Sequence, residues 1–163
     1  MGVAYFGELI GHPGIALSYE NDLHSFGDKI TNDLVLPKSR TLFYGIELGT
    51  FHHKRALNAV FSQVRFGFRK EGRKGGFWSF DLGNGYFMGS IPHTFSVENG
   101  EVSKTRSIHH YSMHSLNFSY GRSLKWLDGA KWFVAPTFYI TRPAFPNYTA
   151  HAALRAGLIK KLK

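Results

Sequence analysis

The chain has 163 residues, of which 43% are hydrophobic and 16% aromatic, and this composition excludes a disordered protein. It has no cysteine, which excludes a disulfide scaffold, a Cys-ligated metal site and a thiol nucleophile. The net charge of +9 favours an anionic partner such as nucleic acid, anionic lipid or lipopolysaccharide. The length predicts a single domain over residues 1–163.

Apolar residues recur at every second position in most of the chain, which predicts strands and not helices. No apolar run approaches the roughly 20 residues of a membrane-spanning helix, and the first residues show no signal peptide. Seven strands are expected, near residues 15–20 and over residues 41–51, 57–69, 78–89, 115–121, 132–141 and 149–162. Residues 3–9 are the candidate for an eighth strand, with 30–36 as an alternative pairing segment.

Three connections between these strands stand out in the sequence. A basic, glycine-containing turn is expected over residues 70–76, and Asp128-Gly129 predicts another turn. The polar stretch 91–107 has Glu98-Asn99-Gly100-Glu101 at its centre and is predicted to be a long loop.

The two faces of the expected strands differ in composition. One face carries large apolar side chains, and the other carries charges among many glycines and serines. A solvated exterior would be richer in Lys, Glu and Thr, whereas the narrow lumen of a membrane barrel admits few bulky side chains and accounts for the glycines. The pattern therefore predicts an all-β fold, an antiparallel up-and-down transmembrane β-barrel of eight strands. The alternative is a soluble β-barrel that binds an apolar ligand inside.

Each face of such a barrel has its own candidate residues. Acidic and basic residues from different strands are expected to pair inside the lumen, as a charge ladder of Glu20, Glu47, Arg65, Asp81 and Arg155. Aromatic residues of the other face suit the girdles at the two bilayer interfaces. These lipid-facing residues are Phe66, Phe68, Trp78, Tyr86, Trp132 and Phe138.

Basic residues gather at the predicted strand ends, namely Lys70, Arg73, Lys74, Lys160, Lys161 and Lys163. In a membrane barrel they could meet lipid phosphates, and they are equally compatible with ordinary solvated turns. Basic and aromatic residues segregate in the sequence, so nucleic acid is not an expected partner.

The nine histidines are the first candidates for a catalytic site. His110 and Ser112 have the spacing at which outer-membrane lipid A deacylases place a base and a nucleophile on one strand. The orienting acid is missing, because after Glu101 the only acidic residue is Asp128, at the opposite end of the barrel. Neighbouring histidines of a strand point to opposite faces, so no metal site and no cofactor are expected. A lipid A-directed esterase remains an alternative hypothesis.

Several segments also carry a resemblance to a known group of proteins. They include Gly7-Glu8-Leu9-Ile10-Gly11-His12-Pro13-Gly14-Ile15-Ala16-Leu17, Gly45-Ile46-Glu47-Leu48-Gly49, residues 52–61, Gly83-Asn84-Gly85-Tyr86 and Pro143-Ala144-Phe145-Pro146. In these segments the chain resembles a family of small, largely uncharacterised outer-membrane β-barrel proteins of Bacteroidota. The resemblance implies architecture and location, with no common activity.

The expected function follows from the barrel and from this resemblance. The sequence predicts a multi-pass protein of the bacterial outer membrane with a structural or accessory role and no catalysis. Outer-membrane lipid and lipopolysaccharide are the expected partners, together with a larger outer-membrane complex. A general porin is not expected, because an eight-stranded lumen is filled by side chains.

Overall fold

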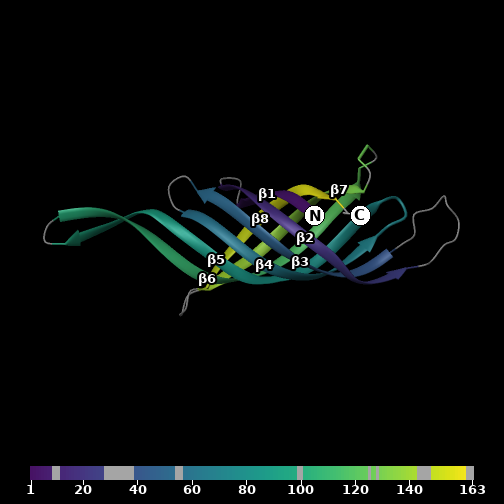
Figure 1. The fold of residues 1–163 in the computed structure, drawn as a ribbon, viewed down its shortest axis with the longest axis horizontal. Helices are drawn as coiled ribbons and strands as arrows, with labels where there is room; N and C mark the ends of the chain where they lie inside the picture. Colours follow the sequence, from purple (N-terminus) through teal and green to yellow (C-terminus); the bar gives the residue numbers. More distant parts are fainter. Residues whose placement is uncertain are drawn as a thin grey trace.

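The computed structural model describes residues 1–8, 12–27, 39–53, 57–98, 101–124, 126–127, 129–142 and 148–160, and these form a single sheet of eight strands (Figure 1). The strands are β1 (Gly2–Glu8), β2 (His12–Gly27), β3 (Ser39–His53), β4 (Leu57–Glu71), β5 (Gly76–Glu98), β6 (Glu101–Ser123), β7 (Ala130–Arg142) and β8 (Thr149–Lys160). Among the described residues, no helix is long and apolar enough to cross a membrane.

The sheet closes into a barrel, because every strand pairs antiparallel with its neighbour in the chain and β1 also pairs with β8. Gly2 lies opposite Ser18 on one side and opposite Ile159 on the other. The predicted all-β, eight-stranded, up-and-down barrel is thereby confirmed, and β1 is its eighth strand. The alternative segment 30–36 lies outside the described residues.

The two ends of the barrel differ. At one end, which we call the terminal end, the amino group of Met1 donates a hydrogen bond of 2.9 Å to the carbonyl of Lys160. The short turn 72–75 lies at this end, where Gly75 adopts a φ of 74° that suits glycine. The opposite end, which we call the hairpin end, carries the tips of β5 and β6 (Figure 1).

The prediction of a long loop over 91–107 is wrong. β5 and β6 remain paired from Ile91↔Ser107 to Glu98↔Glu101, with one irregularity between Ile91 and Thr94. The dipeptide between the last pair is Asn99-Gly100, which is typical of two-residue hairpins. β4 stops pairing with β5 at Ser90, so this ribbon extends beyond the barrel as a two-stranded hairpin (Figure 1).

Large apolar side chains cover the outside of the barrel. Each of the eight strands contributes at least two large hydrophobic side chains that are more than a third exposed, such as Tyr5 on β1 and Leu82 on β5. Away from the bulge at Asp22 to His24, the outward positions among the described side chains carry no Asp or Glu. Away from that bulge, the charged outward side chains that the structure describes all lie within two residues of a strand end, and they are Arg40, Lys70, Arg122, Arg142 and Lys160.

The interior is bulkier than the glycine-rich face suggested. Two apolar clusters lie inside the barrel, one towards the hairpin end (Phe6, Ala16, Phe51, Ala59, Phe61, Phe87, Met113, Tyr139 and Ala153) and one towards the terminal end (Ala4, Phe77, Phe133 and Ala135). Glycines make room for them. A Cβ added at Gly49 would lie 2.3 Å from the ring of Phe61, well inside van der Waals contact. The expectation of few bulky lumen side chains was wrong, because small and large residues alternate across the lumen and fill it together.

Candidate functional site

A buried ion network crosses the lumen between the two apolar clusters, and Arg65 on β4 is at its centre. Nε and Nη2 of its guanidinium donate to the two carboxylate oxygens of Asp81 on β5, at 2.8 and 2.7 Å. Nη1 donates to Oε2 of Glu47 on β3 at 2.8 Å. Both acids are fully buried, and this guanidinium binds Asp81 in the two-pronged geometry that makes an arginine–carboxylate pair strong.

Two further arginines complete the network. Arg155 on β8 donates through Nη2 to the same Oε2 of Glu47 that Arg65 binds. Arg69 on β4 donates through Nη2 to Glu20 on β2, and Glu20 also lies 3.6 Å from Nη1 of Arg65. Three carboxylates therefore face three guanidinium groups, and the network is neutral overall. Burial of charge in a lumen requires this balance.

Polar side chains from strands β4, β6 and β7 form hydrogen bonds to Glu47, Asp81 and Arg155 of the network. Gln63 donates to Oε1 of Glu47 at 3.1 Å, and its own carbonyl accepts from Ser115 at 2.6 Å. Asn117 donates to Oδ1 of Asp81 at 2.7 Å, and its carbonyl accepts from Thr137 at 2.7 Å and from Arg155 at 3.4 Å. Strands β2 to β8 thus all contribute to one connected network.

Aromatic rings lie on both sides of the network, towards the terminal end and towards the hairpin end. The guanidinium of Arg69 lies 4.7 Å from the ring centre of Phe43, and that of Arg155 lies 5.8 Å from that of Phe133. Towards the hairpin end, Phe6 packs against Phe61 at a centroid distance of 5.1 Å. The ions are sealed between apolar layers, so the arrangement suits a permanent cross-brace of the barrel better than a path for protons or ions.

The structure brings together all five residues of the predicted charge ladder: Glu20, Glu47, Arg65, Asp81 and Arg155. Sequence reasoning left out Arg69, and it left out the polar residues Gln63, Ser115, Asn117 and Thr137 that satisfy the ions. For Arg69 and Gln63 the signal was present, since both have the same two-residue parity as Arg65 on their own strand. Ser115, Asn117 and Thr137 lie on strands that contribute no charged residue to the network.

The six aromatic residues predicted to face lipid all lie on the outside of the barrel. Phe66, Trp78, Tyr86 and Phe138 are between 39% and 59% exposed, and Phe68 and Trp132 are half-buried between neighbouring side chains. Trp78 packs against Phe68 and Phe118, and Trp132 packs edge-on against Tyr120. These rings belong to several adjacent strands and form part of a continuous apolar exterior.

His110 and Ser112 lie on the outer face of β6, and the structure does not join them into a catalytic pair. Nδ1 of His110 shares a hydrogen bond with the hydroxyl of Tyr86. The hydroxyl of Ser112 donates to the backbone carbonyl of Arg142 at 3.4 Å. The base and the nucleophile thus have other partners. No carboxylate among the described residues is hydrogen-bonded to His110, so the arrangement lacks the orienting acid that a hydrolase requires.

The other described histidines are spread along the barrel, and His24 packs edge-on against Phe26 near the terminal end. His109 contacts Ser107 at 2.7 Å, His52 contacts Asn58, and His151 stacks on Tyr139 with a centroid distance of 4.6 Å. Within the described part of the chain, no three His, Asp or Glu side chains gather closely enough to hold a metal ion.

Comparison with known proteins adds no relative to this description. No family model, no curated protein and no solved structure matches the chain. The resemblance to the Bacteroidota outer-membrane family therefore stays a prediction from the sequence.

Proposed function

We propose that this protein is an integral β-barrel of the bacterial outer membrane, with a closed lumen and a structural or accessory role. One observation carries the proposal: large apolar side chains cover the outside of the barrel on all eight strands, and among the described side chains, apart from the bulge in β2, the outward charges occur near strand ends. A charged side chain facing lipid at the middle of a bilayer costs roughly 2–4 kcal/mol, and this cost falls towards the interfaces. The observed distribution of charge follows that cost.

The inside supports the same conclusion. A soluble ligand-binding barrel has a polar exterior and an apolar cavity, whereas here the lumen contains a buried ion network and two packed aromatic clusters. The space that an apolar ligand would need is occupied by the protein's own side chains. The same filling argues against a diffusion pore.

An accessory role is supported by the hairpin that β5 and β6 form beyond the barrel. After Ser90, β5 has no pairing with β4. Before Ser112, β6 has no pairing with β7. Such a ribbon has two open backbone edges, which are the usual template for pairing with another chain. A larger outer-membrane complex is therefore the partner that we propose.

Membrane insertion can be tested directly. The chain would be expressed with a signal peptide, the envelope fractionated, and the protein run on a gel with and without heating. We expect a membrane-bound band whose mobility changes on heating, as folded membrane barrels show. A soluble protein with unchanged mobility would contradict the proposal.

A single substitution sharpens this test. Leu82 lies on the outer face of β5 and is 55% exposed. It follows the buried Asp81 in the chain, so it lies at the same height along the barrel as the ion network. In a membrane barrel Leu82→Arg would face lipid near mid-depth and would lower stability by about 2–4 kcal/mol. In a soluble barrel the same change would be close to neutral, because an exposed leucine would give way to an exposed arginine. Gly72→Arg, which adds the same charge in an exposed turn, is the matched control.

A further inference from the structure

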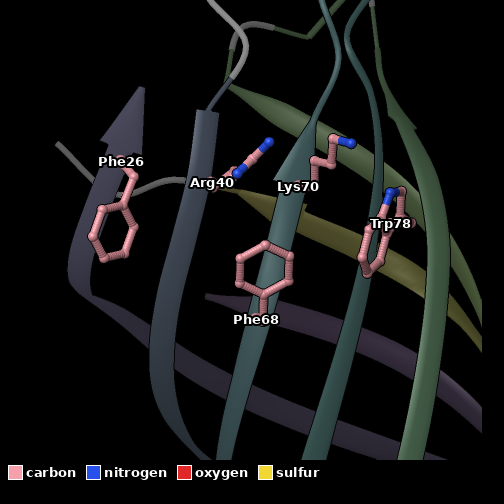
Figure 2. Close-up of a pocket in the computed structure, with 5 residues that line it drawn as sticks. All are labelled: Phe26, Arg40, Phe68, Lys70 and Trp78. Carbon is pink, nitrogen blue, oxygen red and sulfur yellow. The ribbon is translucent and has the colours of Figure 1, made fainter. Parts of the chain in front are cut away.

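An outward groove at the terminal end of the barrel combines two cations with three aromatic rings (Figure 2). It has a volume of about 500 Å³ and is lined by Phe26, Arg40, Phe68, Lys70 and Trp78. Strand register explains the arrangement: Phe26 pairs with Arg40, Arg40 with Lys70, and Lys70 with Trp78. These four residues form one row across the sheet, with an aromatic residue on β2, a cation on each of β3 and β4, and an aromatic residue on β5.

The two central positions of this row repel each other. Arg40 and Lys70 lie directly opposite across β3 and β4 on the outer face, and like charges in that position destabilise a sheet. Among the described residues, neither has a carboxylate within 4 Å. Arg69 and Lys131, at the same end but facing inward, are paired with Glu20 and Glu71. Within the described residues, the outward pair therefore lacks the anionic partners that the inward cations have.

We propose that this groove binds an anionic glycerophospholipid, with its phosphate between Arg40 and Lys70 and its acyl chains along Phe68 and Trp78. This inference rests on the proposed membrane location. An arginine fork beside a lysine is suited to a phosphate group. In Figure 2 the ring of Phe68 lies further from the terminal end of the barrel than the two cations do. An acyl chain that extends from the headgroup into the bilayer would lie along this ring.

The surroundings select a lipid over a free phosphate. Phe26 is 51% exposed and Trp78 is 39% exposed, and a small water-soluble anion would leave both rings in water. Membrane barrels carry girdles of aromatic residues at their interfaces, and basic residues near the membrane surface attract anionic lipid.

The terminal end selects the class of lipid. Outer-membrane barrels have short periplasmic turns and longer extracellular connections. At the terminal end the strands are joined by the turn 72–75 and by the connection 28–38, whereas the longest excursion from the barrel, residues 91–107, is at the hairpin end. The groove thus faces the periplasmic leaflet, where the anionic lipids are glycerophospholipids and not lipopolysaccharide.

Fluorescence quenching tests the proposal with the full chain in vesicles. Trp126→Phe and Trp132→Phe leave Trp78 as the single tryptophan, and the protein would be refolded into phosphatidylcholine vesicles that contain brominated lipid. We expect brominated phosphatidylglycerol to be preferred over brominated phosphatidylcholine by about 25-fold as a quencher, since each of the two cations contributes roughly fivefold near anionic lipid. Arg40→Gln with Lys70→Gln should bring this preference close to one. Arg122→Gln with Lys160→Gln removes the same charges at the same end outside the groove, and should preserve it.

The outcomes separate this inference from the proposed function. Equal quenching by both lipids would overturn the lipid site and leave the membrane barrel intact, whereas no quenching by either lipid would overturn both. A preference that persists without Arg40 and Lys70 would show a general charge attraction and no site. Unbrominated lipids can be added as competitors that relieve the quenching. If lipid A relieved it more strongly than phosphatidylglycerol, the assigned lipid class would be overturned. A heat-modifiable band establishes that each variant has folded.

Discussion

Removing the central cation of the lumen should destabilise the barrel strongly. In Arg65→Met, Asp81 loses two of its three hydrogen-bond donors and keeps only Asn117. Glu47 loses one donor and keeps Arg155 and Gln63. A buried carboxylate without its cation typically costs about 3–5 kcal/mol, and we expect a loss of unfolding free energy in that range.

The assay is urea unfolding of the refolded protein, followed by the heat-modifiable band and by tryptophan fluorescence. With a urea dependence of about 2 kcal/mol per molar, the expected loss moves the midpoint by roughly 2 M. Adding Asp81→Asn to Arg65→Met removes the uncompensated charge, so the double variant should recover at least half of that shift. Arg122→Met removes a guanidinium at an exposed outward position and serves as the control.

Two results would refute this reasoning. A midpoint shift below about 0.5 M for Arg65→Met would mean that water replaces the arginine and that the lumen is not sealed. A double variant less stable than Arg65→Met would mean that lost packing, and not unpaired charge, dominates the effect.

Four further changes test other parts of the structure. Gly49→Ala should cost about 1–3 kcal/mol by overpacking the lumen. Gly72→Ala should be neutral, because an added Cβ would meet only the carbonyl oxygen of Gly76 at 3.5 Å, an ordinary contact, and urea midpoints compare the two variants. Phe6→Ala should cost about 3–5 kcal/mol in the same assay, because this ring is fully buried among other aromatic rings. Ser112→Ala should leave lipid A acylation unchanged by mass spectrometry, and a loss of deacylation would revive the esterase hypothesis. Replacing 92–106 by a short turn should leave the urea midpoint unchanged, because that ribbon pairs only with itself; a lower midpoint would mean that it packs on the barrel.

The alternation of apolar residues with polar or small residues was sufficient to predict most of the fold. Because a strand presents every second side chain to the same side, Glu47 and Arg155 could be assigned to one face and Phe66 and Phe138 to the other without knowledge of pairing. The hairpin over residues 91–107 could not be predicted in this way, for a physical reason. A two-stranded ribbon beyond the barrel has no face against lipid or lumen, so its sequence need not alternate, and its polarity resembles that of a loop.

The contents of the lumen were harder to predict, because parity gives the side of a residue and not its neighbours. Phe61 and Phe66 differ only in parity, yet one fills the interior and the other covers the outside. Which phenylalanines meet inside depends on the stagger between strands, and no single strand encodes that stagger. The same limit applies to Arg40 and Lys70, thirty residues apart in sequence, which become neighbours only through the register of β3 and β4.

The glycines were the most informative signal for the ion network. Arg65 does not pair directly with the acids that it binds, since its Cα partners are Gly45 and Gly83. Asp81 likewise lies opposite Gly67, where an added Cβ would come within 2.5 Å of the aspartate's own Cβ. A long arginine can lean diagonally across the lumen only because the positions beside it have no side chain. Inward glycines on one strand therefore predict a large or charged inward residue on the next, and that rule would have indicated which parts of this lumen are filled from a neighbouring strand.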